Sequence, residues 1–182
     1  MSLLIEGAIG EGGRIVEDRF VTIVDEDSLA AVADDQPIIV SRAVFGLQRA
    51  ALLAGSTPLG ILLFGTDDPA DIADDLSRFA VVAIDFPKFT DGRGYSIARL
   101  LRERHGYRGS IRAVGDVLRD QMFYMLRCGF DAFALRHEAL IEDALNAYRD
   151  FSDGYQTSVD RPVPWFKRRG TVGVAAPAAE AR

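Results

Sequence analysis

The sequence predicts an α/β protein built on a mostly parallel β-sheet. Three runs, PIIV (37–40), LGILLF (59–64) and AVVAIDF (80–86), have the continuous apolar character of strands that are buried on both faces. Two more strand-like runs follow, SIRAVG (110–115) and DAFAL (131–135), and a segment with helical apolar spacing comes after each of the five. Strands that alternate with helices in this way indicate a parallel sheet covered by helices.

Five strand–helix units fit a flavodoxin-like open sheet, with a partial βα barrel as the alternative. The barrel alternative rests on GFDAFAL (129–135), which resembles the strand starts of barrel enzymes. A complete eight-unit barrel usually needs about 250 residues, and this chain has 182. The open sheet is therefore the preferred prediction.

The first two helices are bounded by recognisable end residues. The helix after PIIV stops at Gly55. The helix after LGILLF has Pro69 in its first turn, preceded by Asp67 or Asp68 as N-cap. Apolar residues recur on one face of each segment, so both helices are expected to pack on the sheet.

Three further helices complete the pattern. One runs from about Tyr95 to His105 and stops at Gly106. The next is capped by Asp116 and ends at Gly129, and the last covers HEALIEDALNAYRDF (137–151). All three follow a predicted strand directly, as βα units require.

The chain divides into three parts by composition. Residues 1–35 form a short N-terminal β segment with loops, in which RIVEDRFVTIVDED makes one or two strands and GAIGEGG is a loop. Residues 36–152 form the α/β domain. Residues 153–182 are irregular: RPVPWFKRRG is a docking segment anchored by Trp165 and Phe166, and a disordered tail follows.

Composition excludes several classes of protein. The net charge of −6 argues against broad nucleic-acid binding. No apolar run approaches the roughly 18 residues that span a bilayer, and no cationic region precedes the first apolar residues, so a cytoplasmic location is expected. The single cysteine, Cys128, excludes an internal disulfide and a cysteine-rich metal site. Cys128 is expected to be a buried packing residue.

Charge is distributed unevenly along the chain. Residues 1–87 contain 5 basic and 15 acidic residues, whereas residues 88–182 contain 16 basic and 12 acidic ones. Of the 21 basic residues, 19 are arginine, whose planar fork suits carboxylate, phosphate and sulfur oxyanions. The excess of basic residues lies in the half that holds the candidate site.

The stretch FPKFTDGRGYS (86–96) connects a predicted strand to a predicted helix and is the first candidate site. Gly92 and Gly94 permit positive φ and a close backbone approach, and the helix start favours an anion. Side chains that could bind the anion are Lys88, Thr90, Arg93 and Ser96. The alternative is a plain βα connection in which Asp91 pairs with an arginine.

Loops after neighbouring parallel strands meet at one edge of a sheet, so further residues are expected beside this stretch. Arg112 lies on the next strand and projects toward that edge, or forms a structural ion pair with Asp116 or Asp120. The other candidate ligand-binding residues are Tyr95, Arg99, Asp116 and Gln121. Tyr95 and Asp120 are the candidate proton-transfer groups.

No metal or cofactor is predicted. His105 and His137 lie at a helix end and a helix start, and neither has a second histidine at metal-ligand spacing. The glycine stretch is not a phosphate-binding P-loop, since no Gly-Lys-Ser/Thr follows it, and it lacks the third glycine of a dinucleotide site.

The run from Phe86 to Phe133 resembles a bacterial family on the motifs FTDGRGYS, ARLLRER, RAVGDVLRDQ and RCGFDAF. Members of the family are described as proteins of unknown function or as oxidoreductases involved in sulfite reduction. Their genes commonly lie beside the assimilatory sulfite reductase haemoprotein. The resemblance implies a role in sulfur assimilation and implies no catalytic residues.

Three functional hypotheses remain. The first is an accessory protein of assimilatory sulfite reduction, which binds an anionic ligand or a partner at the arginine-rich loop edge; the haemoprotein or another sulfur-assimilation enzyme is the expected partner. The second is an enzyme, for example an oxidoreductase, that acts on a sulfur oxyanion or a phosphorylated metabolite. The third is a non-catalytic interaction module that uses Trp165 and Phe166.

Overall fold

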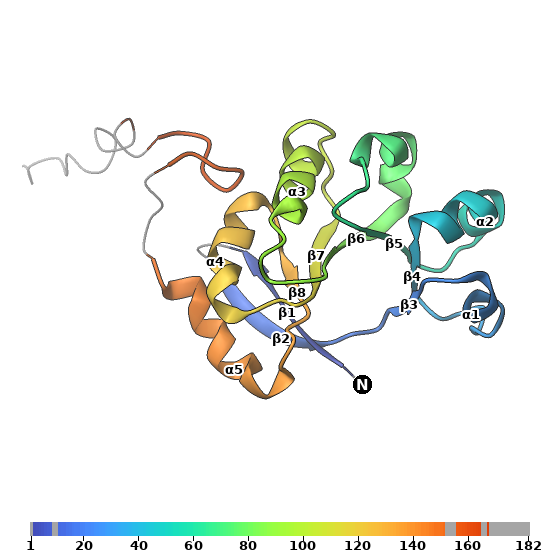
Figure 1. Cartoon of the computed structure of the whole chain (residues 1–182), viewed down its shortest axis with the longest axis horizontal. Coiled ribbons are helices and arrows are strands. Elements are labelled where there is room, and N and C mark those ends of the chain that lie inside the picture. The colour runs from blue at the N-terminus through green and yellow to red at the C-terminus, as the bar shows by residue number, and fades with distance from the viewer. Residues whose placement is uncertain (1, 9–10, 152–155, 165–166, 168–182) are drawn as a thin grey trace, which may run out of the picture.

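The computed structural model describes residues 2–8, 11–151, 156–164 and 167. Within them the chain forms one mixed sheet in the order β2-β1-β8-β7-β6-β5-β4-β3. The strands are β1 (Leu3–Ala8), β2 (Gly12–Glu17), β3 (Val21–Ile23), β4 (Ile38–Ser41), β5 (Leu59–Leu63), β6 (Phe79–Phe86), β7 (Ser110–Gly115) and β8 (Ala132–Phe133). Strands β3 to β8 are parallel, whereas β1 is antiparallel to both β8 and β2. The sheet curls into a half-barrel (Figure 1).

Helices lie on the outer side of this curved sheet (Figure 1). The parallel strands follow one another in chain order, and right-handed crossovers that always step in one direction place every connection on the same face. The connections contain α1 (Glu26–Ala30), α2 (Arg42–Ala54), the 3₁₀ segment η1 (Pro69–Arg78), α3 (Arg93–Glu103) and α4 (Arg119–Cys128). After β8 come η2 (Glu138–Leu140), α5 (Ile141–Ala144) and η3 (Leu145–Arg149).

The strand order corrects the preferred prediction and agrees with its alternative. In a flavodoxin-like sheet the third strand is added on the opposite side of the first strand from the second, so the strand order changes direction. Here each parallel strand from β3 to β8 is added on the same side of the preceding one, and the sheet curls as a partial barrel. The sheet also has more than five strands, because the N-terminal segment supplies β1, β2 and β3. GAIGEGG is predicted to be a loop, but the described residues at its two ends pair as β-strands, with Gly7 opposite Gly13 and Ala8 opposite Gly12.

The two faces of the sheet bury different sets of residues. The outer face packs against the helices through a large apolar cluster that includes Ile61, Ile84 and Ile111, each fully buried. The inner face holds a smaller cluster of Ile39, Leu62, Val81 and Ala83, against which Phe20 and Val114 pack. Because side chains alternate along a strand, the apolar runs that predicted β5 and β6 supply both clusters.

Residues 18–20 cross the open side of the half-barrel, from β2 at one edge to β3 at the other (Figure 1). Asp18 accepts hydrogen bonds from Arg112 of β7 at 2.9 and 3.0 Å. The Arg112 guanidinium also lies 5.4 Å from the centre of the Phe20 ring. Arg112 therefore forms a structural ion pair, but with Asp18 rather than with Asp116 or Asp120.

Several helix ends follow the prediction. Asp68 accepts a hydrogen bond from Ala70 N at 2.9 Å and caps η1, with Pro69 in the first turn. Gly129 ends α4 with a φ of 107°, in the left-handed region that favours glycine. Asp116, in contrast, does not cap α4, whose N-cap is Leu118. Cys128 is buried, as expected, and burial raises the pKa of its thiol.

The last strand–helix unit is less regular than expected. The strand predicted over 131–135 is limited to Ala132–Phe133. In place of the single helix predicted over 137–151, the chain forms the short helical segments η2, α5 and η3. Within the described residues, no helix has both the length and the apolar character needed to cross a membrane.

Candidate functional site

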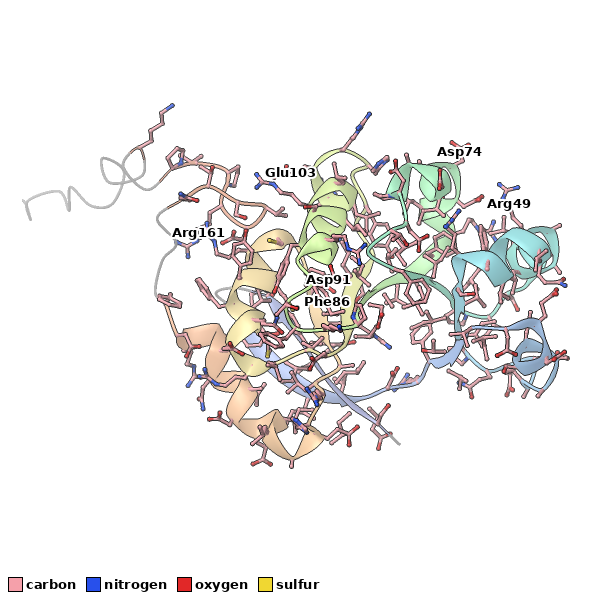
Figure 2. All side chains as sticks on the ribbon, viewed as in Figure 1. Arg49, Asp74, Phe86, Asp91, Glu103 and Arg161 are labelled. Atoms are coloured by element: carbon pink, nitrogen blue, oxygen red, sulfur yellow. The ribbon has the colours of Figure 1, made fainter. Side chains whose placement is uncertain are left out.

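The carboxyl ends of the parallel strands form one edge of the half-barrel, and the loops that follow them carry the candidate site. Four of these loops contribute, with Gly65 after β5, residues 87–92 after β6, Asp116 after β7 and Arg136 after β8. We call this region the carboxyl edge. Figure 2 labels Phe86 and Asp91 where β6 passes into the loop that leads to α3. Ligands of barrels and of open α/β sheets bind at the corresponding edge.

Asp91 holds Arg93 in a bidentate ion pair at the start of α3. Oδ1 of Asp91 accepts from the Arg93 backbone N at 3.2 Å and from Nε at 3.0 Å, and Oδ2 accepts from Nη2 at 2.7 Å. These hydrogen bonds lower the pKa of Asp91 to about 2. The Asp91 side chain is 15% exposed and that of Arg93 57%. The carboxylate thus orients a guanidinium whose outer edge faces solvent.

Two glycines allow close approaches around this pair. A Cβ atom on Gly65 would lie 2.9 Å from Arg93 Nε, so the bare backbone at this position makes room for the guanidinium. A Cβ atom on Gly94 would lie 2.6 Å from the Phe86 ring, so Gly94 lets α3 pack closely on β6. Neither Gly92 nor Gly94 uses the positive φ that glycine permits, because neither is among the positive-φ glycines of the described residues.

Asp85 is a functional candidate that sequence analysis missed. It precedes the last residue of β6, and alternation with Val81 and Ala83 places its side chain on the inner face of the sheet. A Cβ atom on Gly115, whose φ is 90°, would lie 2.7 Å from Asp85 Oδ1. Gly115 thus leaves room for the carboxyl group.

The Asp85 carboxyl group is half-buried and has no hydrogen-bond or ion-pair partner in the part of the chain that the structure describes. Burial raises its pKa, and the negative charge of Asp91 raises it further. Asp85 was hidden inside the run AVVAIDF, which was interpreted as a fully apolar strand. A carboxylate at the carboxyl end of an apolar parallel strand is the signal that could have identified it.

Asp116 and Gln121 hold the loop after β6 in place. Asp116 accepts from Phe89 N at 3.1 Å and from Arg136 at 2.9 Å, and both hydrogen bonds lower the pKa of its carboxyl group. Gln121 donates to Phe89 O at 2.9 Å and accepts from Leu118 N at 3.0 Å. These two candidate residues therefore lie at the carboxyl edge, where they position Phe89.

Two other candidates, Arg112 and Arg99, lie elsewhere, whereas Tyr95 lies beside the carboxyl edge. Arg112 is buried on the inner face with Asp18 and does not project to the carboxyl edge. Arg99 pairs with Glu103 at 3.0 Å, and Figure 2 shows Glu103 at the far end of α3 from Asp91. Tyr95 packs edge-on against Phe86, and burial raises the pKa of its phenol.

The remaining candidates are small or exposed. Asp120 is exposed in the first turn of α4, and Gly92 is exposed at the start of α3. Lys88, Thr90 and Ser96 are also exposed around the loop after β6. Trp165 and Phe166 lie outside the described residues. Within those residues, no group of three or more His, Cys, Asp or Glu side chains is arranged to hold a metal ion.

A groove of about 500 Å³ continues the carboxyl edge across β3, β4 and β5. Exposed Val24, Leu47 and Phe64 line it. Its polar groups include Arg42 and Asp67, which pair with each other at 2.8 Å. No local sequence pattern indicates this groove, because its lining residues come from three separate segments.

Comparison with known proteins gives one match. The family model described as "Bacterial protein of unknown function (DUF934)" matches residues 60–166, which include all but the first residue of β5, the strands β6 to β8 and the loops of the candidate site. No curated protein matches the chain, and no solved structure matches it.

Proposed function

Because the chain belongs to the DUF934 family of bacterial proteins of unknown function, we propose its role from the resemblance of its central motifs and from the geometry of the carboxyl edge. It is an accessory protein of assimilatory sulfite reduction. It binds an anionic ligand, or the anionic surface of a partner, at the carboxyl edge. The partner is the sulfite reductase haemoprotein or another enzyme of sulfur assimilation.

The observation that carries this proposal is the exposed guanidinium of Arg93. Asp91 accepts from the Nε hydrogen and from one Nη2 hydrogen, which leaves the outer donors of the guanidinium directed at solvent. A preoriented guanidinium loses little conformational freedom when it binds an oxyanion or a carboxylate. Lys88, exposed in the same loop, adds a second positive charge.

Growth of a deletion strain tests the pathway. The gene is deleted in the bacterium that encodes the protein. The deletion strain is grown with sulfate as the sole sulfur source and, as a control, with cysteine. The proposal predicts a growth defect on sulfate that cysteine relieves. The wild-type gene and Arg99→Gln restore growth, whereas Arg93→Gln does not. Normal growth of the deletion strain on sulfate contradicts the pathway.

A second candidate function, an enzyme acting on a sulfur oxyanion or a phosphorylated metabolite, is favoured by Asp85 and Asp91. The pKa of Asp91 is lowered to about 2, whereas that of Asp85 is raised. Neighbouring carboxyl groups with pKa values moved apart are typical of acid–base pairs, so Asp85 is a better candidate for proton transfer than Asp120 or Tyr95.

Thermal shift measurements test this second candidate. Purified protein is mixed with sulfite, sulfate, adenylyl sulfate, a flavin or a nicotinamide nucleotide. If the protein is an enzyme of this kind, at least one of these compounds should raise its melting temperature. The increase should be smaller in Asp85→Asn. Absence of any shift removes the basis for an enzyme and leaves the accessory role to the growth experiment.

A further inference from the structure

We propose that the carboxyl edge selects an oxyanion that carries a proton: Arg93 donates to the oxygens of the anion, and the Asp85 carboxylate accepts a hydrogen bond from its O–H group. This inference rests on the proposed function, because it concerns the ligand of the same site. It adds the chemical class of that ligand. Hydrogen phosphate and hydrogen sulfite belong to the class, and sulfate does not.

The hydrogen-bonding groups of the site lead to this inference. Arg93 offers donors on its solvent-facing edge, as described above. Asp85 offers only acceptors when it is ionised, and no donor of the described residues occupies them. A ligand that satisfies both residues must therefore supply acceptor oxygens on one side and a hydrogen-bond donor on the other.

The charges of the site restrict the ligand in the same direction. Asp91 neutralises Arg93 in their ion pair, and the charge of Asp91 also acts on Asp85. An anion without a proton would therefore meet the Asp85 carboxylate beside a guanidinium that Asp91 neutralises, with the exposed Lys88 as the remaining positive charge of the loop. A hydrogen atom shared between the anion and Asp85 converts that repulsion into a charge-assisted hydrogen bond.

The backbone leaves room for this arrangement on both sides of β6. Gly65 follows β5 and lies against Arg93, while Gly115 ends β7 and lies against Asp85. A Cβ atom at either position would come closer than 3.0 Å to the charged side chain. The two groups that would contact the ligand thus each lie beside a glycine from a neighbouring strand.

Phosphate and sulfate provide a matched pair of probes, because both are tetrahedral oxyanions of similar size. Phosphate retains at least one proton near neutral pH, because its second ionisation occurs near that pH and its third only at strongly alkaline pH, whereas sulfate is fully ionised. The affinities of both anions are measured by isothermal titration calorimetry at constant ionic strength, with sulfite as a third probe. The wild-type protein is expected to bind phosphate and sulfite about tenfold or more tightly than sulfate.

Two variants with matched controls show which residue causes the selectivity between phosphate and sulfate and which residue binds all three anions. Asp85→Asn is expected to weaken phosphate binding and strengthen sulfate binding, which brings the two affinities within about threefold, because an amide can donate as well as accept. Asp74→Asn, which removes an exposed carboxylate from η1, should leave the ratio unchanged. Arg93→Gln should lower the affinity for all three anions about tenfold, whereas Arg99→Gln should leave these affinities unchanged.

The outcomes separate this inference from the proposed function. If all three anions bind with Arg93-dependent affinity but Asp85→Asn does not change their ratio, the selection by Asp85 is overturned and anion binding stands. If sulfate binds as tightly as phosphate in the wild-type protein, the selection is likewise overturned. If no anion binds, small-anion binding at the carboxyl edge fails, and the inference fails with it.

Discussion

Arg112 of β7 and Asp18, 94 positions apart in the chain, form an ion pair at 2.9 Å across the inner face of the half-barrel. Their side chains are 5% and 15% exposed, respectively. Asp18 lies in the only segment of the described chain that joins the two edge strands, β2 and β3. The pair therefore fastens residues 18–20 over the face that a complete barrel would cover with further strands.

Replacing Asp18 should destabilise the fold. Asp18→Asn leaves the buried Arg112 guanidinium without a counter-charge, which should lower the free energy of unfolding by about 2–4 kcal/mol. Urea denaturation measures the change. Glu17→Gln, at an exposed neighbouring position, serves as control and should have little effect. Equal stabilities of the two variants would show that the pair does not fasten the segment.

Gly115 should tolerate no side chain. At its φ of 90°, a Cβ atom would lie 2.5 Å from Phe86 O and 2.7 Å from Asp85 Oδ1. Gly115→Ala should therefore cost about 1–3 kcal/mol of stability. Gly92→Ala is the matched control, because a Cβ atom there meets nothing within 4 Å. A melting temperature of Gly115→Ala equal to that of Gly92→Ala would contradict the described geometry.

Arg102 of α3 joins several elements and should be important for stability. It donates to the carbonyl oxygens of Tyr107, Gly109 and Gly129 and to Asp131, at 2.7–2.9 Å. Arg102→Met removes these hydrogen bonds, and we expect a loss of about 2–4 kcal/mol in chemical denaturation. Arg104→Met, at an exposed position of the same region, should change stability little. A loss as small as that of the control would refute this role.

Asp85 should make the protein less stable as pH rises. Because its pKa is raised in the folded state, the folded protein binds more protons than the unfolded chain between the ordinary carboxyl pKa of about 4 and the raised value. Stability therefore falls as pH rises through that window, and Asp85→Asn removes the fall. The variant should be more stable than wild type at neutral pH, with the difference vanishing at low pH.

Urea denaturation at a series of pH values measures this effect. Asp74→Asn, which removes an exposed carboxylate, is the control and should follow the wild-type profile. An Asp85→Asn variant that is less stable than wild type at neutral pH would mean that the carboxylate has a stabilising partner.

The central strands could be predicted from the sequence because their determinants are local. SIRAVG coincides with β7, and the run 59–64 differs from β5 by one residue. Continuous apolar runs carry this information, since each strand is buried on both faces. In contrast, β1 depends on its pairing with β2 and β8, so its own sequence carries little indication of a strand.

The candidate site was predicted in part for the same reason. The pairing of Asp91 with an arginine is local and is one of the two alternatives that the sequence leaves open, and the structure identifies that arginine as Arg93. The partner of Arg112 could not be identified, because 94 residues separate it from Asp18. Asp85 does not stand out in the sequence, because the other residues of its run, AVVAIDF, are all apolar. Only the fold shows that its carboxyl group lies beside Gly115 and, within the described residues, has no partner.

Anion binding by Arg93 is tested most directly by titrating the protein with sulfite and following the backbone amide signals in its NMR spectrum. Binding at the carboxyl edge predicts saturable shifts that cluster at Gly65, residues 91–94 and residues 115–116, and that disappear in Arg93→Gln. Shifts confined to the groove lined by Val24 and Phe64, or no saturable shifts at all, would contradict it.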